Sequence, residues 1–298
     1  MPLPSHGGSG SAPASLSSEV SEAAYPVSAT RPTGGVAYYL RVLRVVGVIE
    51  FKAKYAGAAL GYIWSLAKPL AYFGVLWLVF AHLLRTANQT EDFTLFLLIG
   101  ILLFTFFSDC VGVMLPSIVV GGSILRRLAF PPILVPLSAS VGICITFLVN
   151  ISALVIFLGL ERVAPQPEWL LVIPLLVELY VFCLGVGLLL AALYVRFRDV
   201  GQIWELGVQL LFFASAIFYP IGILPEWAQK IAFLNPFVQV MQDIRHAILG
   251  SSGPNDLTAA SVYSGAGGRL IPILIAIFIF VGALAFFRRE GRYFAERV

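Results

Sequence analysis

The 298-residue chain contains 59% hydrophobic and only 12% charged residues, whereas an ordinary soluble domain carries about 25% charged residues. Together with a mean hydropathy of +0.92, this composition excludes a water-soluble globular protein, because a soluble fold can hide apolar side chains only in its core. The net charge of +3 is too small to indicate a nucleic-acid partner. The sequence therefore predicts an all-α polytopic membrane protein.

The first 59 residues divide into two parts. Residues 1–35 contain eight Ser and five each of Gly, Pro and Ala, with no apolar run that could form the core of a signal peptide, and we predict a disordered cytosolic tail. Residues 36–59 interleave apolar with basic side chains, as a helix lying along a membrane surface does. The same pattern would also suit docking of a partner protein, and the sequence leaves both open.

Six later segments are long and apolar enough to cross a bilayer, which takes roughly 20 mainly apolar residues. If the N-terminus is cytosolic, fourteen of the nineteen Lys and Arg residues fall on the inner side, and the positive-inside rule then places both ends in the cytosol. We therefore predict a six-helix domain over residues 60–298 in the bacterial cytoplasmic membrane. Its spans cover 64–84, 93–115, 133–160, 169–195, 203–224 and 270–287.

The stretch from 225 to 269, after the fifth predicted span, differs from the rest in its prolines and its Gly/Ser-rich end. Within it, residues 237–249 place apolar side chains on one face and polar ones elsewhere, which predicts a short interfacial or re-entrant helix on the outer side. Backbone that breaks at Pro220 and Pro225 near membrane depth must be covered by protein or line a wet cavity. The end of the fifth span is therefore a candidate gate, with an ordinary capped helix end as the alternative.

Motifs for catalysis, nucleotide binding and metal binding are missing from the sequence. The chain contains no G-x-x-x-x-G-K-[ST] phosphate-binding loop, so we expect no ATP hydrolysis by this chain. Its three His residues lack the spacing of metal ligands. Cys110, Cys144 and Cys183 fall in apolar segments, where we expect free thiols. We predict no catalytic residue, no metal site and no cofactor bound by this chain.

Three acidic residues lie inside predicted spans, namely Asp109, Glu178 and Glu205. A carboxylate at the middle of a bilayer costs roughly 2.5 to 3.5 kcal/mol on insertion scales, so each should face protein or a water-filled path. Pairing with a neighbouring helix is one interpretation, and contact with cargo is the other. Glu178 lies deepest in its span and is the better functional candidate.

Aromatic residues form 13% of the chain and cluster in the first, second and fifth spans. A sugar ring can stack its C–H face on an aromatic ring, so an aromatic-lined duct would let a glycan slide. Contact with lipid or with a neighbouring helix is the alternative for any single ring. The candidate channel-facing residues, two acids included, are Tyr72, Trp77, Phe104, Asp109, Glu178, Phe213 and Tyr219.

Several short motifs between about 41 and 254 resemble one known family in the same order along the chain. They are Lys54-Tyr55, Leu60-Gly61-Tyr62-Ile63-Trp64, Pro69, Phe130-Pro131, Leu134-Val135-Pro136, Val195-Arg196-Phe197-Arg198-Asp199-Val200, Tyr219-Pro220, Asn235-Pro236 and Arg245. The ordered set resembles the membrane subunit of ABC-2 type exporters for polysaccharides such as O-antigen, capsule, teichoic acid and galactan. Phe104 stands where family members often have Trp, and Ala216 stands where Pro is common.

The resemblance implies a homodimer bound to two copies of a separate ABC ATPase, which would carry ATP and Mg, with a channel along the dimer axis. The helix before the first span and the segment between the second and third spans would contact the ATPase. Arg126 and Arg127 could equally be positive-inside anchors. The candidate coupling residues are Arg41, Arg44, Lys52, Lys54, Tyr55, Ser123, Arg126, Arg127 and Phe130. The candidate gate residues are Pro220, Pro225, Asn235, Pro236 and Arg245, and Arg196, Arg198 and Asp199 form a structural loop.

The implied cargo is a lipid-linked polysaccharide. Each hydroxyl of a glycan is expensive to strip of water without a replacement partner, so the polymer needs a lined passage. The pyrophosphate of the lipid carrier would lie near the basic side chains of the interface helix. The alternatives are an ABC-2 permease for a drug or lipid, and a membrane-embedded glycosyltransferase or acyltransferase.

Overall fold

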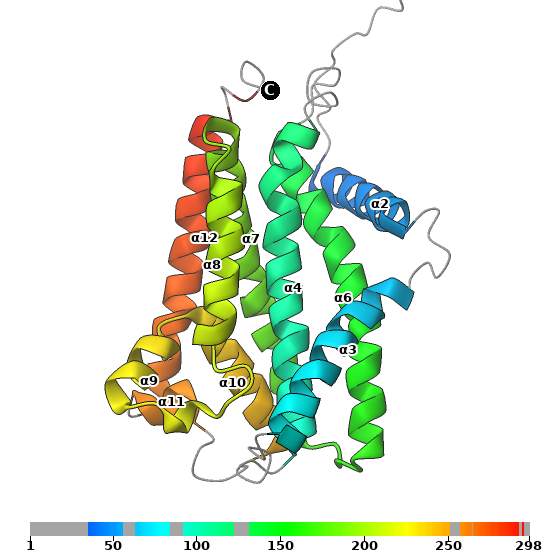
Figure 1. Cartoon of the computed structure of the whole chain (residues 1–298). Helices are drawn as coiled ribbons and strands as arrows, with labels where there is room; N and C mark the ends of the chain where they lie inside the picture. The colour runs from blue at the N-terminus through cyan, green and yellow to red at the C-terminus, as the bar shows by residue number, and fades with distance from the viewer. Residues whose placement is uncertain are drawn as a thin grey trace, which may run out of the picture. The chain divides into compact units, whose positions relative to one another are not determined.

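The computed structural model describes residues 35–55, 63–83, 92–121, 131–250, 257–263, 265–291 and 294. All regular elements in these parts of the chain are helices (Figure 1). All but the last residue of the predicted tail (1–35) lies outside the described residues, as do Ser123, Arg126, Arg127 and Phe130, and the side chains of Lys54 and Tyr55 are not described.

Nine helices make up most of the described chain, and short 3₁₀ or π turns join or extend some of them. The helices are α2 (Val36–Tyr55), α3 (Ile63–Trp77), α4 (Phe93–Val120), α6 (Leu134–Leu160), α7 (Val172–Arg196), α8 (Val200–Ala214), α9 (Glu226–Phe233), α10 (Pro236–Leu249) and α12 (Leu270–Glu290), with a single turn of helix, α11, at Ala259–Val262. A π-helical turn at Leu78–Leu83 extends α3, and a 3₁₀ turn at Pro167–Leu171 leads into α7. The chain is therefore an all-helical fold, as the composition predicts.

Five of the six predicted spans appear as helices long and apolar enough to cross a membrane. They run over Ile63–Ala81, Phe93–Val120, Leu134–Leu160, Pro167–Arg196 and Gly267–Glu290. The segment predicted as the span 203–224 differs, because α8 ends at Ala214 and is shorter than the other five. A turn over 215–220 and a 3₁₀ turn at Ile221–Ile223 take up the rest of that segment. The six-span count therefore remains a prediction.

Helix α4 is the centre of the fold. Figure 1 shows it between α3 and α6 on one side and α7, α8 and α12 on the other, and it contacts α3, α6, α7, α8 and α10. Most of its side chains are buried, from Phe93 to Ile118. A helix that is apolar all round, as α4 is, forms the core of a large helical protein, because each of its faces meets another helix.

Glycines set the closest helix contacts. A Cβ atom added at Gly185 in α7 would lie 2.9 Å from the backbone nitrogen of Phe280 in α12. A Cβ atom at Gly47 in α2 would lie 2.6 Å from Cγ1 of Val141 in α6. Small residues of this kind let two helix backbones approach closely, which is a common means of helix association in membranes. The packing of α7 on α12 therefore depends on glycine at position 185, and the packing of α2 on α6 depends on glycine at position 47.

Helices α9, α10 and α11 lie together at the end of the fold where α12 begins (Figure 1). Helix α10 packs against α4, α7, α9 and α12. Its apolar face and most of its polar face are both buried, including Gln239, Gln242 and Asp243. The predicted amphipathic pattern is present, but the polar side chains of α10 meet other helices and do not form an open polar surface.

Candidate functional site

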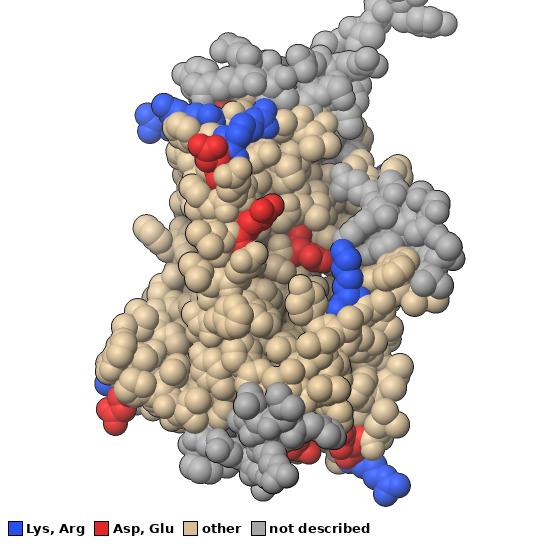
Figure 2. Space-filling view, in the orientation of Figure 1, with Lys and Arg blue, Asp and Glu red and all other residues tan. Residues whose placement is uncertain are grey.

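A groove of about 810 Å³ lies between α3, α4 and α8, with α6 contributing at its base. Four of the seven predicted channel-facing residues line it together: Tyr72, Phe104, Asp109 and Phe213. The sequence placed these residues in three separate spans, and the fold brings the spans together. Figure 2 shows a mainly uncharged belt across this face, with most charged side chains towards its two ends and a few within it. The groove is the candidate functional site.

Aromatic rings form much of the groove wall. Phe104 packs edge-on against Phe212 of α8, with ring centroids 5.1 Å apart, and against Phe237 of α10 at 5.6 Å. These contacts hold one edge of the groove in place. Tyr72 and Phe213 remain 67% and 63% exposed, so their ring faces are open to a bound molecule.

Polar groups are spread among the rings of the groove. Its lining includes hydroxyl and amide side chains and one charge of each sign: Ser65, Lys68, Thr105, Ser108, Asp109, Thr146 and Gln209. A surface that combines aromatic faces with hydrogen-bonding groups can replace the water around a hydroxyl-rich molecule while stacking on its apolar faces. The groove therefore has the chemistry to hold a sugar chain.

The other three predicted channel residues lie elsewhere. Trp77 donates its indole N–H to the Thr94 hydroxyl at 3.2 Å, which ties α3 to α4. Tyr219 donates its hydroxyl to the backbone carbonyl of Phe213 at 3.0 Å, folding the turn back on the end of α8. Glu178 lines a second cavity between α7, α10 and α12. That any of these three faces cargo stays a prediction.

The predicted gate residues mark the boundaries of the helices that follow α8. Pro220 precedes the 3₁₀ turn at Ile221–Ile223, and Pro225 precedes α9. Asn235 caps α10, since its side-chain oxygen accepts a hydrogen bond from the Phe237 amide at 3.0 Å, and Pro236 occupies the first turn. Proline suits that first turn because its missing N–H would have no helical partner there. The sequence signals thus locate real helix ends.

Arg245 is the most informative of the gate residues, because it is buried and joins three segments. Its Nε donates to the carbonyl of Phe96 in α4 at 3.0 Å, and its Nη1 and Nη2 donate to the carbonyls of Ala216 and Ile217 at 3.0 and 2.7 Å. The guanidinium also lies 3.5 Å from the centroid of the Phe96 ring. Gly100 leaves room for it, since a Cβ atom there would collide with Nη2. Arg245 therefore fastens the turn after α8 to the central helix.

Ala216 has an unusual backbone conformation in that same turn, with φ of 52°. Proline fixes φ near −65°, so the residue common in the family at this position does not fit this backbone. The turn that presents two carbonyls to Arg245 has instead a left-handed alanine, which costs about 1–2 kcal/mol relative to the usual region. Alanine, and not proline, is therefore compatible with the backbone at this position.

We expect Ala216→Pro to lower the free energy of unfolding by about 3 kcal/mol or more. Proline would force φ to the wrong sign and would disfavour the conformation of Ser215, which has φ −90° and ψ 11°. Ala216→Gly is the matched control, because glycine tolerates positive φ and should change stability by less than about 1 kcal/mol. The apparent melting temperatures of both variants in detergent test this; equal values would contradict it.

The predicted coupling and loop residues are exposed where the structure describes them. Arg41, Arg44 and Lys52 lie on the open side of α2, which packs on α6. At the junction of α7 and α8, Arg198 stacks over the ring of Tyr194 at 5.1 Å, and Asp199 stands just before α8. Arg196 is exposed and lies 5.2 Å from the ring of Phe197. Both regions keep positive charge available at the surface.

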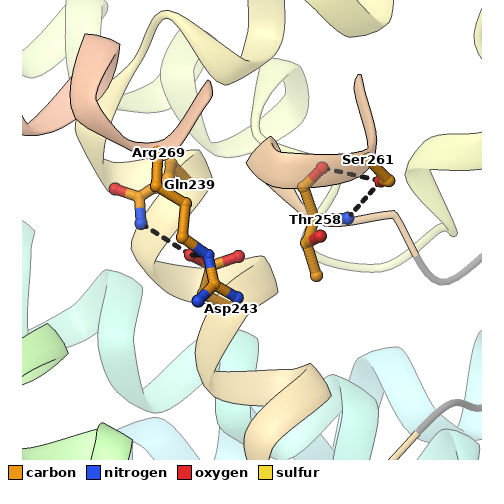
Figure 3. A network of polar contacts seen from close by, with 5 residues as sticks. All are labelled: Gln239, Asp243, Thr258, Ser261 and Arg269. Carbon is orange, nitrogen blue, oxygen red and sulfur yellow. Dashed lines mark hydrogen bonds and ion pairs between the residues drawn. The ribbon is translucent and has the colours of Figure 1, made fainter. Parts of the chain in front are cut away.

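The second cavity, which contains Glu178, holds about 510 Å³. Gln239 donates to Asp243 at 2.8 Å, and Arg269 pairs with the same carboxylate at 3.3 Å (Figure 3). Burial raises the pKa of the Asp243 carboxyl above its usual value, while the hydrogen bond from Gln239 and the charge of Arg269 act against that change. The sequence singled out Glu178 here, but it did not predict that Gln239 and Asp243 of α10 line the same cavity.

The contacts of two other groups were not predicted from the sequence. Phe107 stacks on Phe182 of α7 at 5.5 Å and also contacts Trp204 of α8 and Phe237 of α10. Gly100 and Gly185 permit the close approaches described above. The residue pairs involved are far apart in the sequence, and no local pattern marks their meeting.

The long apolar helices and the lined groove define a multi-pass membrane protein with a passage-like site. A family model described as ABC-2 type transporter matches residues 41–249, which is most of the chain, and the chain therefore belongs to this family. It is 27% identical over 216 residues to the O-antigen export system permease protein RfbA of Klebsiella pneumoniae, covering 72% of this chain and 83% of the relative.

Two further relatives are similar over comparable lengths of the chain. The O-antigen export system permease protein RfbA of Myxococcus xanthus is 30% identical over 196 residues, covering 64% of this chain and 74% of the relative. The polysialic acid transport protein KpsM of Escherichia coli is 20% identical over 204 residues, covering 67% of this chain and 78% of the relative. The family resemblance drawn from the sequence motifs is confirmed.

Proposed function

We propose that this chain is the permease subunit of an ABC exporter that moves a lipid-linked polysaccharide outward across the cytoplasmic membrane. The observation that carries the proposal is membership of the ABC-2 transporter family over residues 41–249, together with relatives named for O-antigen export and polysialic acid transport. The aromatic groove supports the same cargo, because it combines ring faces with hydrogen-bonding side chains.

In this proposal the chain contributes the passage and a partner contributes the energy. Two copies of the chain form a channel and bind two copies of an ABC ATPase, which carries ATP and Mg. The exposed basic residues of α2, namely Arg41, Arg44 and Lys52, lie where they can meet the ATPase or the pyrophosphate of the cargo lipid. No residue of this chain needs to break a bond. In the same proposal, both termini and the coupling surfaces face the cytosol.

The groove can bind a sugar chain without holding any one sugar unit at a fixed position. A stacked ring stabilises a sugar without demanding one set of hydrogen bonds, so successive sugar units can replace one another along Tyr72 and Phe213. Lys68 and the hydroxyl groups of the groove replace part of the water that each unit gives up. A groove of this kind suits a polymer that slides.

We expect ATP hydrolysis by the complex, rebuilt in liposomes with an ABC ATPase partner, to rise several-fold with polyprenyl-pyrophosphate-linked polysaccharide and not with a hydrophobic drug. Phe213→Ala should weaken the apparent affinity for the polysaccharide about five-fold, the loss of one stacking contact of about 1 kcal/mol. Phe278→Ala is the control, since Phe278 is 78% exposed on α12 and lies outside the groove.

Two results would overturn the proposal. Delivery of polysaccharide by this chain alone, without nucleotide, would remove the need for a partner ATPase. Stimulation by the drug and not by the polysaccharide would favour the alternative, an ABC-2 permease for small amphiphiles. An equal loss in Phe213→Ala and Phe278→Ala would leave the cargo assignment standing but would show that the groove is not its path.

A further inference from the structure

The second cavity is distinct from the aromatic groove. It lies between α7, α10 and α12, whereas the groove lies between α3, α4 and α8. Its walls are mainly apolar, and Val177 and Ile277 at its rim are 58% and 47% exposed on membrane-crossing helices. Exposed aliphatic side chains on such helices are suited to contact with hydrocarbon. The cavity therefore opens where lipid tails would lie.

The floor of the cavity carries acceptor oxygens that no other group satisfies. Gln239 and Asp243 are 0% and 2% exposed, and among the described residues Oε1 of Gln239, Oδ1 of Asp243 and Oε1 of Glu178 have no hydrogen-bond partner. A carboxylate can only accept hydrogen bonds, so the Gln239 amide must turn its NH₂ group to Asp243. The amide oxygen of Gln239 then faces away from Asp243 as an acceptor. Among the described residues that line the cavity, the buried polar atoms without a hydrogen-bond partner are therefore these three oxygens and one donor, Nε of Arg269.

The charges that line the cavity also favour a ligand with N–H donors. The cavity is lined by three acids, Glu168, Glu178 and Asp243, against one arginine, Arg269, and one histidine, His246, and Glu168 is exposed. Arg269 is paired with Asp243 and is 39% exposed at the side chain, so it stands at the mouth. The interior therefore favours a compact cation with several N–H donors, while the mouth favours an anion beside it.

We propose that this cavity binds the head group of a phospholipid bearing a primary ammonium, as phosphatidylethanolamine does. The ammonium has three donors for the three open oxygens, the adjacent phosphate meets Arg269, and the acyl chains lie along the apolar rim at Val177 and Ile277. Phosphatidylcholine carries the same charge but has no N–H donor, and phosphatidylglycerol lacks the cation. The acidic floor also disfavours a pyrophosphate, so this site is separate from the cargo path and does not depend on the cargo being a polysaccharide.

The test is native mass spectrometry of the full chain in detergent, incubated with equal amounts of dioleoyl phosphatidylethanolamine, phosphatidylcholine and phosphatidylglycerol. We expect one ethanolamine lipid to be retained about five- to ten-fold over either of the others, the selectivity of one charge-assisted hydrogen bond. Glu178→Gln and Asp243→Asn should each reduce this preference to less than about two-fold. Glu205→Gln, an exposed acid of α8 outside the cavity, is the matched control and should keep it.

A second variant separates binding from folding. Ile277→Trp obstructs the lipid-facing rim without touching the polar floor, and it should lower retention of the ethanolamine lipid while leaving the melting temperature unchanged. Equal retention of ethanolamine and choline lipids, preference for phosphatidylglycerol, or full selectivity in Glu178→Gln would overturn the proposal. Complete displacement by soluble glycerophosphoethanolamine would do so too, because the rim would then contribute nothing.

Discussion

Replacing Arg245 with alanine is expected to lower the free energy of unfolding by about 3–5 kcal/mol, the cost of breaking a buried charged network. The side chain is 2% exposed and donates to three backbone carbonyls, of Phe96, Ala216 and Ile217. Without it these carbonyls lose their charged donors, and a buried polar group without a partner costs about 1–3 kcal/mol. For a chain of this size that loss corresponds to a fall of about 6–20 °C in melting temperature.

Arg245→Lys separates charge from geometry. An ammonium on a flexible stem cannot reproduce the planar fork that reaches three carbonyls at once, so we expect this variant to recover only part of the lost stability. Lys230→Ala, an exposed cation on α9, is the control and should change stability by less than about 0.5 kcal/mol. A melting temperature of Arg245→Ala within a degree of the unmodified protein would show that the network adds nothing.

Gly185→Ala is expected to destabilise the packing of α7 on α12 by about 1–3 kcal/mol, the usual cost of overfilling a tight contact. The new methyl group would meet the backbone of Phe280 at 2.9–3.0 Å. A backbone cannot rotate away as a side chain can, so α12 would have to shift as a whole. The melting temperature in detergent measures the effect.

The matched control for this substitution is Gly282→Ala on α12 itself. Apart from the adjoining residues and backbone of α12 itself, no atom of the described residues lies within 4 Å of the Cβ that this change would add, and alanine favours a helix interior over glycine by about 1 kcal/mol. The two substitutions are chemically identical, yet their effects should have opposite signs. Destabilisation by both, or by neither, would mean that the contact between Gly185 and Phe280 is not tight.

The sequence predicted the helical class and most of the span positions, because a run of about 20 apolar residues is a local signal. It also located the boundaries at Pro225 and Pro236, where proline and a capping Asn act within a few residues. The end of α8 was predicted too late, at 224 and not at Ala214. The residues from 215 to 224 are apolar enough to extend a span, and nothing in their composition shows that they turn.

The candidate site was predictable only in part, for a similar reason. Aromatic composition singled out Tyr72, Phe104 and Phe213, which line one groove. Family resemblance pointed to Arg245 as a gate residue, whereas its contacts to Phe96 and Ala216 appear only in the fold. Likewise, the amphipathic pattern of α10 predicted an interfacial or re-entrant helix, but not that its polar face is buried against α7 and α12. Contacts between distant segments depend on tertiary packing, which a local pattern does not record.

The short length of α8 has a consequence for the lipid around it. At 1.5 Å per residue, its 15 residues extend only about 22 Å, against roughly 30 Å of hydrocarbon. Hydrophobic mismatch of this size is met by local thinning of the bilayer or by tilt of neighbouring helices. If α8 is the sixth span, the bilayer beside it must thin, and a head group crossing there would travel a shorter distance than along the five longer helices.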